Sequence, residues 1–274
     1  MQSRCSPQRA RRPQALGQLL ETMGFRPIAR HRSREVLLYR QGDMNVIINA
    51  HASELPRALQ PSETPTIAAI CFRVRDAAAA YRRALDRGAW AVPARAEVME
   101  LNIPSVHGVG SSRIYFVDRY AEFSIYDVDF TWIPTVDRNP LPVAGMHWFG
   151  VVQYIGANRT DDWTEFYREL FAFEVLPDTE RFGILPKGRV LKSPCRKFYL
   201  QLIAPRPELL DVDQEEQLQR VAFGAPDVLA AVTALRQRGV EFLESSGVHT
   251  EQRGALTQAR LGGVMFELVQ HTPS

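Results

Sequence analysis

Short apolar runs alternate with turn residues along most of the chain, and two stretches add a helix with its own start and stop signals. The stretch ICFRVRDAAAAYRRALDRGAWAV matches VAFGAPDVLAAVTALRQRGVEFL without a gap. Asp76 and Gly88 of the first copy recur, both 151 positions later, as Asp227 and Gly239. Asp is a favourable N-cap and Gly a favourable C-cap, so the pattern predicts a helix of about a dozen residues in each copy.

The repeat divides the chain into two similar halves of the α+β class. A weaker match joins LLETMGF to YRELFAF, where a helix ends shortly before a Phe. Alternating runs at 34–49 and 113–130 are typical of antiparallel hairpins, and GMHWFGVVQYIG at 145–156 predicts a strand. A period of about 150 residues is the size of a domain, so it indicates pseudo-symmetric halves and not a solenoid.

The boundary between the halves is predicted from proline content. Residues 135–142, TVDRNPLP, contain two prolines and are expected to link a first half at 1–134 to a second half at 143–274. The counterpart of strand 145–156 would fall before residue 1, so the first half is expected to lack its first strand. The unpaired sheet edge that follows is one surface through which a homo-oligomer could form.

Composition narrows the class of protein. The formal net charge is +2, from 33 basic and 31 acidic residues, which gives no argument for nucleic-acid or membrane binding. The basic run at 4–12, RCSPQRARR, is either a nucleic-acid arm or a solvated terminus, and the second reading is favoured. Three cysteines without CxxC spacing and no long apolar segment favour a cytoplasmic protein.

Several sequence blocks together carry a more specific signal. They are ARHRS, LYRQGDMNVIIN, FRVRDAAAAYRRALDRGA, MELNIPSVHGVG, IYFVDRY and SIYDVDF, followed more weakly by FYRELFAFE, LQRVAFGAPD and GGVMFELVQ. This set resembles the 4-hydroxyphenylpyruvate dioxygenase family of the vicinal-oxygen-chelate superfamily, most strongly from Met23 to about Pro140. The resemblance implies a fold of paired βαβββ modules, with two modules in each half.

The resemblance also implies Fe(II) bound in the second half by two histidines and one glutamate, with positions open for an α-keto acid and O₂. His147 in GMHWFG matches the first histidine, and Glu267 in VMFELVQ matches the glutamate. Arg220 in LQRVAF stands where the second histidine is expected. A guanidinium has no lone pair for a metal and stays protonated, so it cannot replace an imidazole.

Two environments for Arg220 follow from this position. If its side chain turns into the cavity, a bidentate ion pair with Glu267 is expected in the space of the metal. The alternative is an arginine at the edge of a strand whose charged end reaches solvent.

Other positions depart from the family or stay ambiguous. Gly254 and Ile203 fall near positions where the family carries a Gln and an Asn, and the family's C-terminal lid helix is expected to be absent. Trp148 and Phe149 either wall a pocket for an aromatic substrate or pack in the core. The remaining histidines show no metal-ligand spacing and are predicted to lie at the surface or in loops: His31, His51, His107, His249 and His271.

Three functions remain open at this stage, and so does the question of whether the chain is an enzyme. The first is an Fe(II)-dependent 4-hydroxyphenylpyruvate dioxygenase with a compromised metal site. The second is a non-catalytic relative that binds a small aromatic or keto-acid ligand, with Arg220 as the carboxylate anchor. The third is a dioxygenase-like module related to bifunctional dehydroshikimate dehydratases, which the stretch GFRPIARHRS also resembles.

Overall fold

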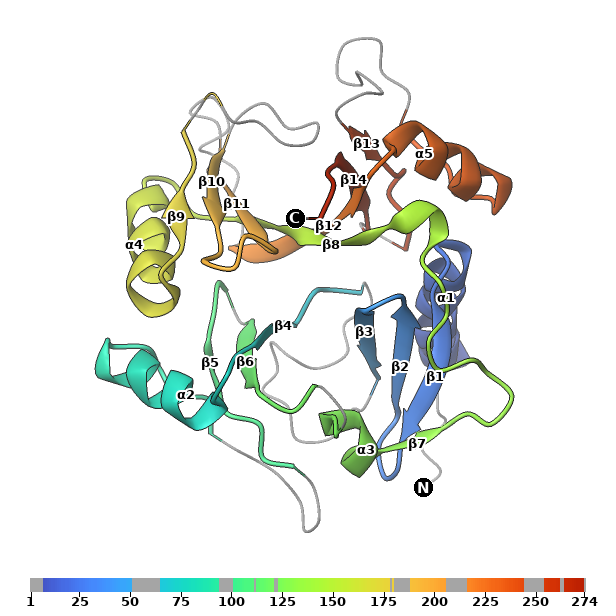
Figure 1. Ribbon diagram of the computed structural model, residues 1–274, viewed down its shortest axis with the longest axis horizontal. Coiled ribbons are helices and arrows are strands. Elements are labelled where there is room, and N and C mark those ends of the chain that lie inside the picture. Colours follow the sequence, from blue (N-terminus) through green and yellow to red (C-terminus); the bar gives the residue numbers. More distant parts are fainter. Residues whose placement is uncertain are drawn as a thin grey trace.

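The computed structural model describes residues 7–50, 65–93, 101–110, 112–120, 123–177, 179, 188–205, 216–243, 254–261 and 264–273. Within these ranges the chain folds into two α+β halves that lie against each other (Figure 1). The described helices do not include one that is both long and apolar enough to cross a membrane.

The second half is built on one seven-stranded sheet, in the order β13-β14-β12-β8-β11-β10-β9. Two modules meet at its centre, a βαβββ module and one that is βαββ over the described residues. There β8 and β12 pair antiparallel, with β11 parallel to β8 and β14 parallel to β12. The first module contains β8 (His147–Tyr154), α4 (Thr160–Phe171), β9 (Glu174–Val175), β10 (Arg189–Lys192) and β11 (Tyr199–Ile203). The second module contains β12 (Gln217–Ala225), α5 (Val228–Gln237), β13 (Gly254–Leu256) and β14 (Phe266–Gln270).

The first half has its strands in two separate sheets. One sheet has the order β3-β2-β1-β7 and the other β4-β6-β5, so β3 and β4 are both edge strands. The elements of this half and of the connection to the second half are α1 (Pro7–Thr22), β1 (Arg26–His31), β2 (Val36–Gln41), β3 (Met44–Asn49), β4 (Ala69–Arg73), α2 (Ala77–Asp86), β5 (Ser105–His107), β6 (Arg113–Val117), α3 (Ile125–Asp129), β7 (Phe130–Trp132) and the 3-10 turn η2 (Val143–Gly145).

The pseudo-symmetry explains why the first half is divided. In the second half, β8 lies between β11 and β12 and joins the two modules into one sheet. In the first half, the described residues do not include a strand before α1 that would join β3 and β4 in the same way.

The two repeated helices begin and end where the sequence predicts. The side chain of Asp76 accepts a hydrogen bond from the backbone nitrogen of Ala79, and Asp227 does the same for Ala230. Gly88 and Gly239 follow the two helices with φ of 87° and 89°, a left-handed conformation that glycine adopts without strain.

One local prediction is wrong. The alternating run at 113–130 forms one strand, β6, and then the short helix α3 instead of a second hairpin strand. A capping box explains this, because the Ser124 side chain accepts from Tyr126 N and the Asp127 side chain accepts from Ser124 N.

The main hydrophobic cores cross from one half to the other. One core packs α2 against α4 (Figure 1), with Phe72 of the first half in ring contact with Phe171, Phe173 and Phe198 of the second. The other core packs α1 near α5, and Phe223 of β12 contacts Phe25 across the same boundary. The halves are therefore held together by apolar packing on the helix-covered faces of their sheets.

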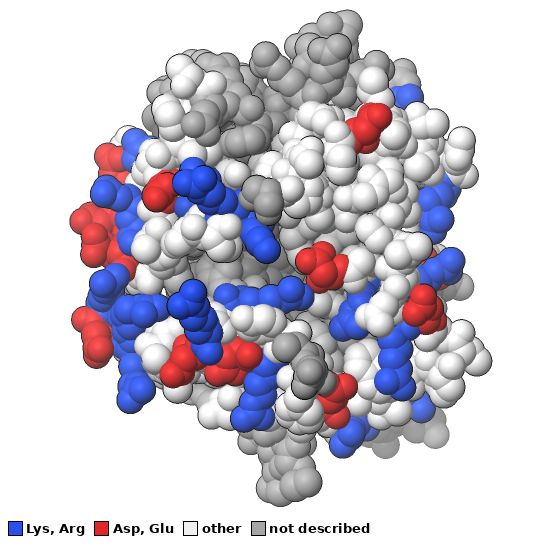
Figure 2. Space-filling view, in the orientation of Figure 1, with Lys and Arg blue, Asp and Glu red and all other residues white. Residues whose placement is uncertain are grey.

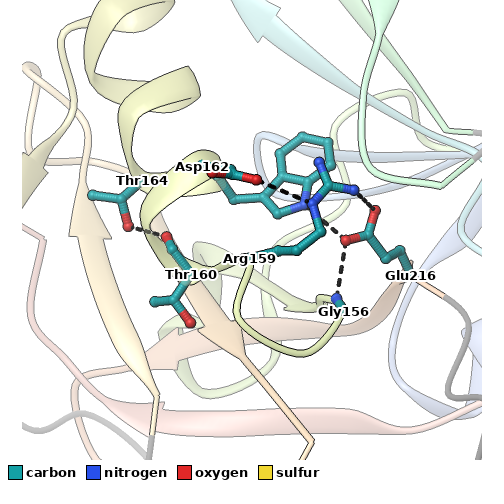
Figure 3. A network of polar contacts seen from close by, with 7 residues as sticks. Gly156, Arg159, Thr160, Asp162, Thr164 and Glu216 are labelled. Atoms are coloured by element: carbon teal, nitrogen blue, oxygen red, sulfur yellow. Dashed lines mark hydrogen bonds and ion pairs between the residues drawn. The ribbon is translucent and has the colours of Figure 1, made fainter.

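A polar network fixes the start of α4 to the entrance of β12 (Figure 3). The Glu216 carboxylate accepts hydrogen bonds from Gly156 N at 2.9 Å and from the Trp163 indole at 3.0 Å, and it pairs with Arg159 at 3.2 Å. A carboxylate at the first turn of a helix also compensates the helix dipole. This network positions β12, which carries Arg220, relative to the first module.

We predict that Phe223→Ala lowers the free energy of unfolding by about 3–5 kcal/mol, because it leaves a cavity in the core shared by the halves. Chemical denaturation followed by tryptophan fluorescence measures this change. Leu229→Ala in α5, whose side chain is exposed, is the control, with an expected change below about 0.5 kcal/mol. Similar small losses for both variants would show that the halves do not depend on this core.

Candidate functional site

The three positions singled out by the sequence lie on one face of the seven-stranded sheet. Arg220 pairs with Val152, and Ala222 pairs with Glu267 on one side and Gly150 on the other. Paired residues project to the same side of a sheet, and residues two apart in one strand do so as well. Arg220 and Glu267 therefore share the face opposite to Val221 and Phe223, which belong to the core.

His147 lies on the same face at the start of β8. It pairs with Gly224, which is two residues after Ala222. A Cβ atom at Gly224 would come within 2.3 Å of His147 Nε2, so the imidazole lies directly over the glycine backbone. A larger residue at 224 would displace the ring from this face.

Arg220 is buried, with 4% of its surface exposed. Its Nε and Nη2 atoms have no hydrogen-bond partner in the described structure. The ion pairs between described residues do not include one between Arg220 and Glu267, so the expected bidentate pair is not formed. The alternative of a solvent-exposed strand-edge arginine is also wrong, because the side chain is enclosed.

Glu267 is buried as well, with 3% of its surface exposed. It borders a cavity of about 20 Å³ that is also lined by Phe149, Tyr199, Gln201 and Val269. The rings of Phe149 and Tyr199 stack with centroids 4.5 Å apart and close this face of the sheet. A cavity of this size has room for about one water molecule, whereas pockets for drug-sized ligands measure about 300–1,000 Å³.

The imidazole of His147 is hydrogen-bonded to a second histidine, His271. His147 Nδ1 lies 3.2 Å from the carbonyl oxygen of Gly145, and His147 Nε2 lies 2.9 Å from His271 Nδ1. Only an N–H can bond the carbonyl, so the neutral His147 carries its proton on Nδ1 and accepts at Nε2 from His271. The lone pair that could bind a metal is therefore engaged.

His271 is the site residue that the sequence reading missed. It follows β14 and lies on the same face as Glu267 by strand alternation, with its ring 5.1 Å from Phe149 and 5.2 Å from His147. Burial lowers the pKa of His271, and the neighbouring His147 lowers it further. Strand alternation could have identified His271, because position 271 is four residues after Glu267 and therefore falls on the same face of the sheet.

The other candidate residues separate into different environments. Phe149 lies on the site face, as expected for a residue that walls a pocket. Trp148 packs against Phe223 in the core, which was the alternative for this pair. His31 and His107 belong to strands of the first half. His51 and His249 lie outside the described residues.

The donor set differs from that of an iron site with two histidines and a carboxylate. Among the described residues there is no group of three or more His, Cys, Asp and Glu side chains that could hold a metal ion. Glu267 and His147 carry lone pairs, but Arg220 brings a fixed positive charge to the same face. The residues on this face therefore do not match the chemistry of a ferrous ion.

Comparisons with known proteins identify the two halves separately. Residues 5–131 match the family described as hydroxyphenylpyruvate dioxygenase, HPPD, N-terminal. Residues 146–268 match the Glyoxalase/Bleomycin resistance protein/Dioxygenase superfamily.

Similar curated proteins match most of the chain. A 4-hydroxyphenylpyruvate dioxygenase of Pseudomonas aeruginosa is 31% identical over 245 residues, which cover 86% of this chain and 69% of that protein. Hemolysin VllY of Vibrio vulnificus is 30% identical with the same coverage. A 3-dehydroshikimate dehydratase of Pseudomonas aeruginosa is 32% identical over 84% of this chain but only 37% of its own length.

Solved structures support the same fold. A fusion protein of a xylose isomerase-like TIM barrel and 4-hydroxyphenylpyruvate dioxygenase superposes with a TM-score of 0.71 at 24% identity. The match covers 94% of this chain and 47% of the fusion protein. A triple mutant of 4-hydroxymandelate synthase from Streptomyces coelicolor gives a TM-score of 0.70 at 18% identity, covering 94% and 88% of the two chains.

We predict that Arg220→Met raises the free energy of unfolding by about 1–3 kcal/mol, because it removes a buried charge without hydrogen bonds and keeps most of the side-chain volume. Equilibrium denaturation measures the change. Arg82→Met, on the exposed side of α2, is the matched control and should change stability by less than about 0.5 kcal/mol. A loss of more than about 1 kcal/mol in Arg220→Met would mean that the guanidinium stabilises the fold.

Proposed function

Because this chain belongs to the 4-hydroxyphenylpyruvate dioxygenase family, we propose that it is a relative that binds a small organic carboxylate through Arg220 in place of Fe(II). The single observation that carries this proposal is the buried guanidinium edge without a partner. It stands on the face where the family resemblance places the metal.

The chemistry of the unpartnered atoms supports an oxyanion ligand. Nε and Nη2 form one edge of the guanidinium, and this edge can donate two parallel hydrogen bonds to a carboxylate. A buried arginine without a partner carries a desolvation penalty, and a bound carboxylate would offset it. Glu267 lies one strand away on the same face, and a negative charge on its carboxyl would oppose a second anion, so the ligand must gain most of its binding energy from Arg220.

The packing of the site supports a small ligand group. The cavity beside Glu267 measures about 20 Å³, which holds about one water molecule, so even a small carboxylate needs the side chains around it to move slightly. An aromatic keto acid would need the stacked side chains of Phe149 and Tyr199 to move apart. Such ligands therefore bind more weakly than small carboxylates unless these two rings rearrange.

An Fe(II)-dependent dioxygenase is the competing function, and similarity to proteins named 4-hydroxyphenylpyruvate dioxygenase favours it. Against it stand the charge of Arg220 and the hydrogen bond that engages His147 Nε2. A ferrous ion on this face would meet the carboxylate of Glu267, an imidazole that is already hydrogen-bonded and a cation.

We predict that pyruvate binds the protein in the presence of EDTA and that Arg220→Gln weakens this binding at least tenfold. Hydrogen bonds to charged groups contribute about 1.5–3 kcal/mol, and about 1.4 kcal/mol is a factor of ten in affinity. Isothermal titration calorimetry measures both affinities. Metal-dependent binding, together with O₂ uptake on addition of Fe(II) and 4-hydroxyphenylpyruvate, would contradict the proposal and establish the dioxygenase.

We predict that Arg220→His raises the Co(II) or Fe(II) content of anaerobically loaded protein at least tenfold over the parent. The exchange removes the repelling charge and adds a third group with a lone pair beside His147 and Glu267. Metal analysis after gel filtration gives the occupancy. Arg220→Gln separates the two causes, because it removes the charge without adding an imidazole. Equal occupancy in the His and Gln variants would show that the face no longer has the geometry of a metal site.

A further inference from the structure

A second cluster of charged side chains lies in the first half and has no part in the site described above. A cavity of about 2,810 Å³ extends between the halves and along the strands of the first half. Figure 2 shows the molecule hollowed between its two halves, with basic side chains above and below the hollow. Arg40 of β2 and Arg73 of β4 both line this cavity.

Arg40 is held in place by neutral groups. Its Nε donates to Asn45 Oδ1 at 2.8 Å, and its Nη1 donates to the carbonyl oxygen of Arg138 at 3.0 Å. The guanidinium also lies 6.0 Å from the ring centroid of Tyr126 and 5.8 Å from that of Trp132. These contacts orient the charge without neutralising it.

Arg73 reaches the same space from the other sheet of the first half. Its Nη2 donates to the carbonyl oxygen of Asp43 at 3.2 Å, and its guanidinium lies 5.6 Å from the ring centroid of Tyr120. Strand alternation places Arg73 and Cys71 on the face opposite to Ile70 and Phe72, which pack against the core. The two arginines therefore converge on the cavity from separate sheets.

Neither arginine has a carboxylate partner among the described ion pairs. Tyr126 and, more weakly, Asp127 act to raise the pKa of Arg40, but the Asp127 carboxylate already accepts two hydrogen bonds from Ser124 in the cap of α3. Burial lowers the pKa of Arg40, and the positive charge of Arg73 contributes in the same direction. Two cations that repel each other in a partly desolvated cavity form a site for an anion.

We propose that the first half binds a small oxyanion group, a carboxylate or a phosphate, between Arg40 and Arg73. The neutral partners hold the guanidinium of Arg40 in a fixed orientation, so part of the ordering of the site is complete before the ligand arrives. The proposal does not depend on Arg220, because the two sites lie in different halves.

Cys71 provides an internal reporter for the site. It lines the same cavity, and solvent reaches its side chain. Although part of the residue is exposed at the cavity wall, the protein packed around its sulfur raises the pKa of the Cys71 thiol to about 11 by desolvation. The thiol is therefore mostly protonated at pH 8 and reacts slowly, and a ligand between the arginines should slow it further.

The test is calorimetric titration of the full chain with benzoate and, separately, with inorganic phosphate. We expect at least one of the two probes to bind, and Arg40→Gln and Arg73→Gln each to weaken that binding at least tenfold. Arg82→Gln, on the exposed side of α2, is the control and should change the affinity for that probe less than twofold. Binding of benzoate alone would indicate a carboxylate ligand, and binding of phosphate alone a phosphorylated one.

A second measurement tests the site without the Arg40 variant, in case that variant does not fold. Alkylation of Cys71 by iodoacetamide, followed by mass spectrometry of its peptide, should be slowed by the bound probe in the parent and not in Arg73→Gln. The proposal is overturned if neither probe binds, or if the affinities of the parent and both arginine variants agree within twofold. An equal loss in Arg220→Gln would also overturn it, and would place the anion in the second half.

Discussion

The antiparallel pairing of β8 with β12 is the constraint on which the site depends. Its register sets His147 over Gly224 and Arg220 opposite Val152, and β14 then brings Glu267 beside Ala222. The pairing is interrupted twice, by one extra residue on β12 at Gln219 and one on β8 at Phe149. A shift of one residue would move a whole strand's side chains to the other face, so register decides which residues form the site.

The buried guanidinium of Arg220 opposes folding, whereas the packing around it favours folding. Most of the core is apolar and shared between the halves, which gives the fold its stability. The charge of Arg220 is buried, and its Nε and Nη2 atoms lack hydrogen bonds, so this side chain lowers the stability of the fold. Such local destabilisation is typical of positions kept for function, where a bound partner completes the interactions.

The two halves share a fold but have different interiors. In the second half, Phe149 and Tyr199 stack across the inner face and leave little space. In the first half, the sheet is divided between β3 and β4, and the inner face opens into a large cavity with Arg40 and Arg73 on its wall. The same module arrangement thus supports a closed face in one half and an open, cationic face in the other.

The sequence by itself determined the features that depend on neighbouring residues. The caps at Asp76 and Asp227, the internal repeat and the strand that carries Arg220 follow from local propensity and alternation, and the structure confirms them. A local signal, the capping box of α3, was also present but was outweighed by the alternating pattern around it.

Tertiary structure decided what depends on distance between remote residues. The contact of His271 with His147 joins positions 124 apart in the chain, and no spacing rule predicts it. The lack of an ion pair between Arg220 and Glu267, and the closure of the cavity beside them, depend on strand register and on how two aromatic rings pack. Local pattern specifies which face a side chain occupies, whereas its partners are set by strands that meet only in the folded chain.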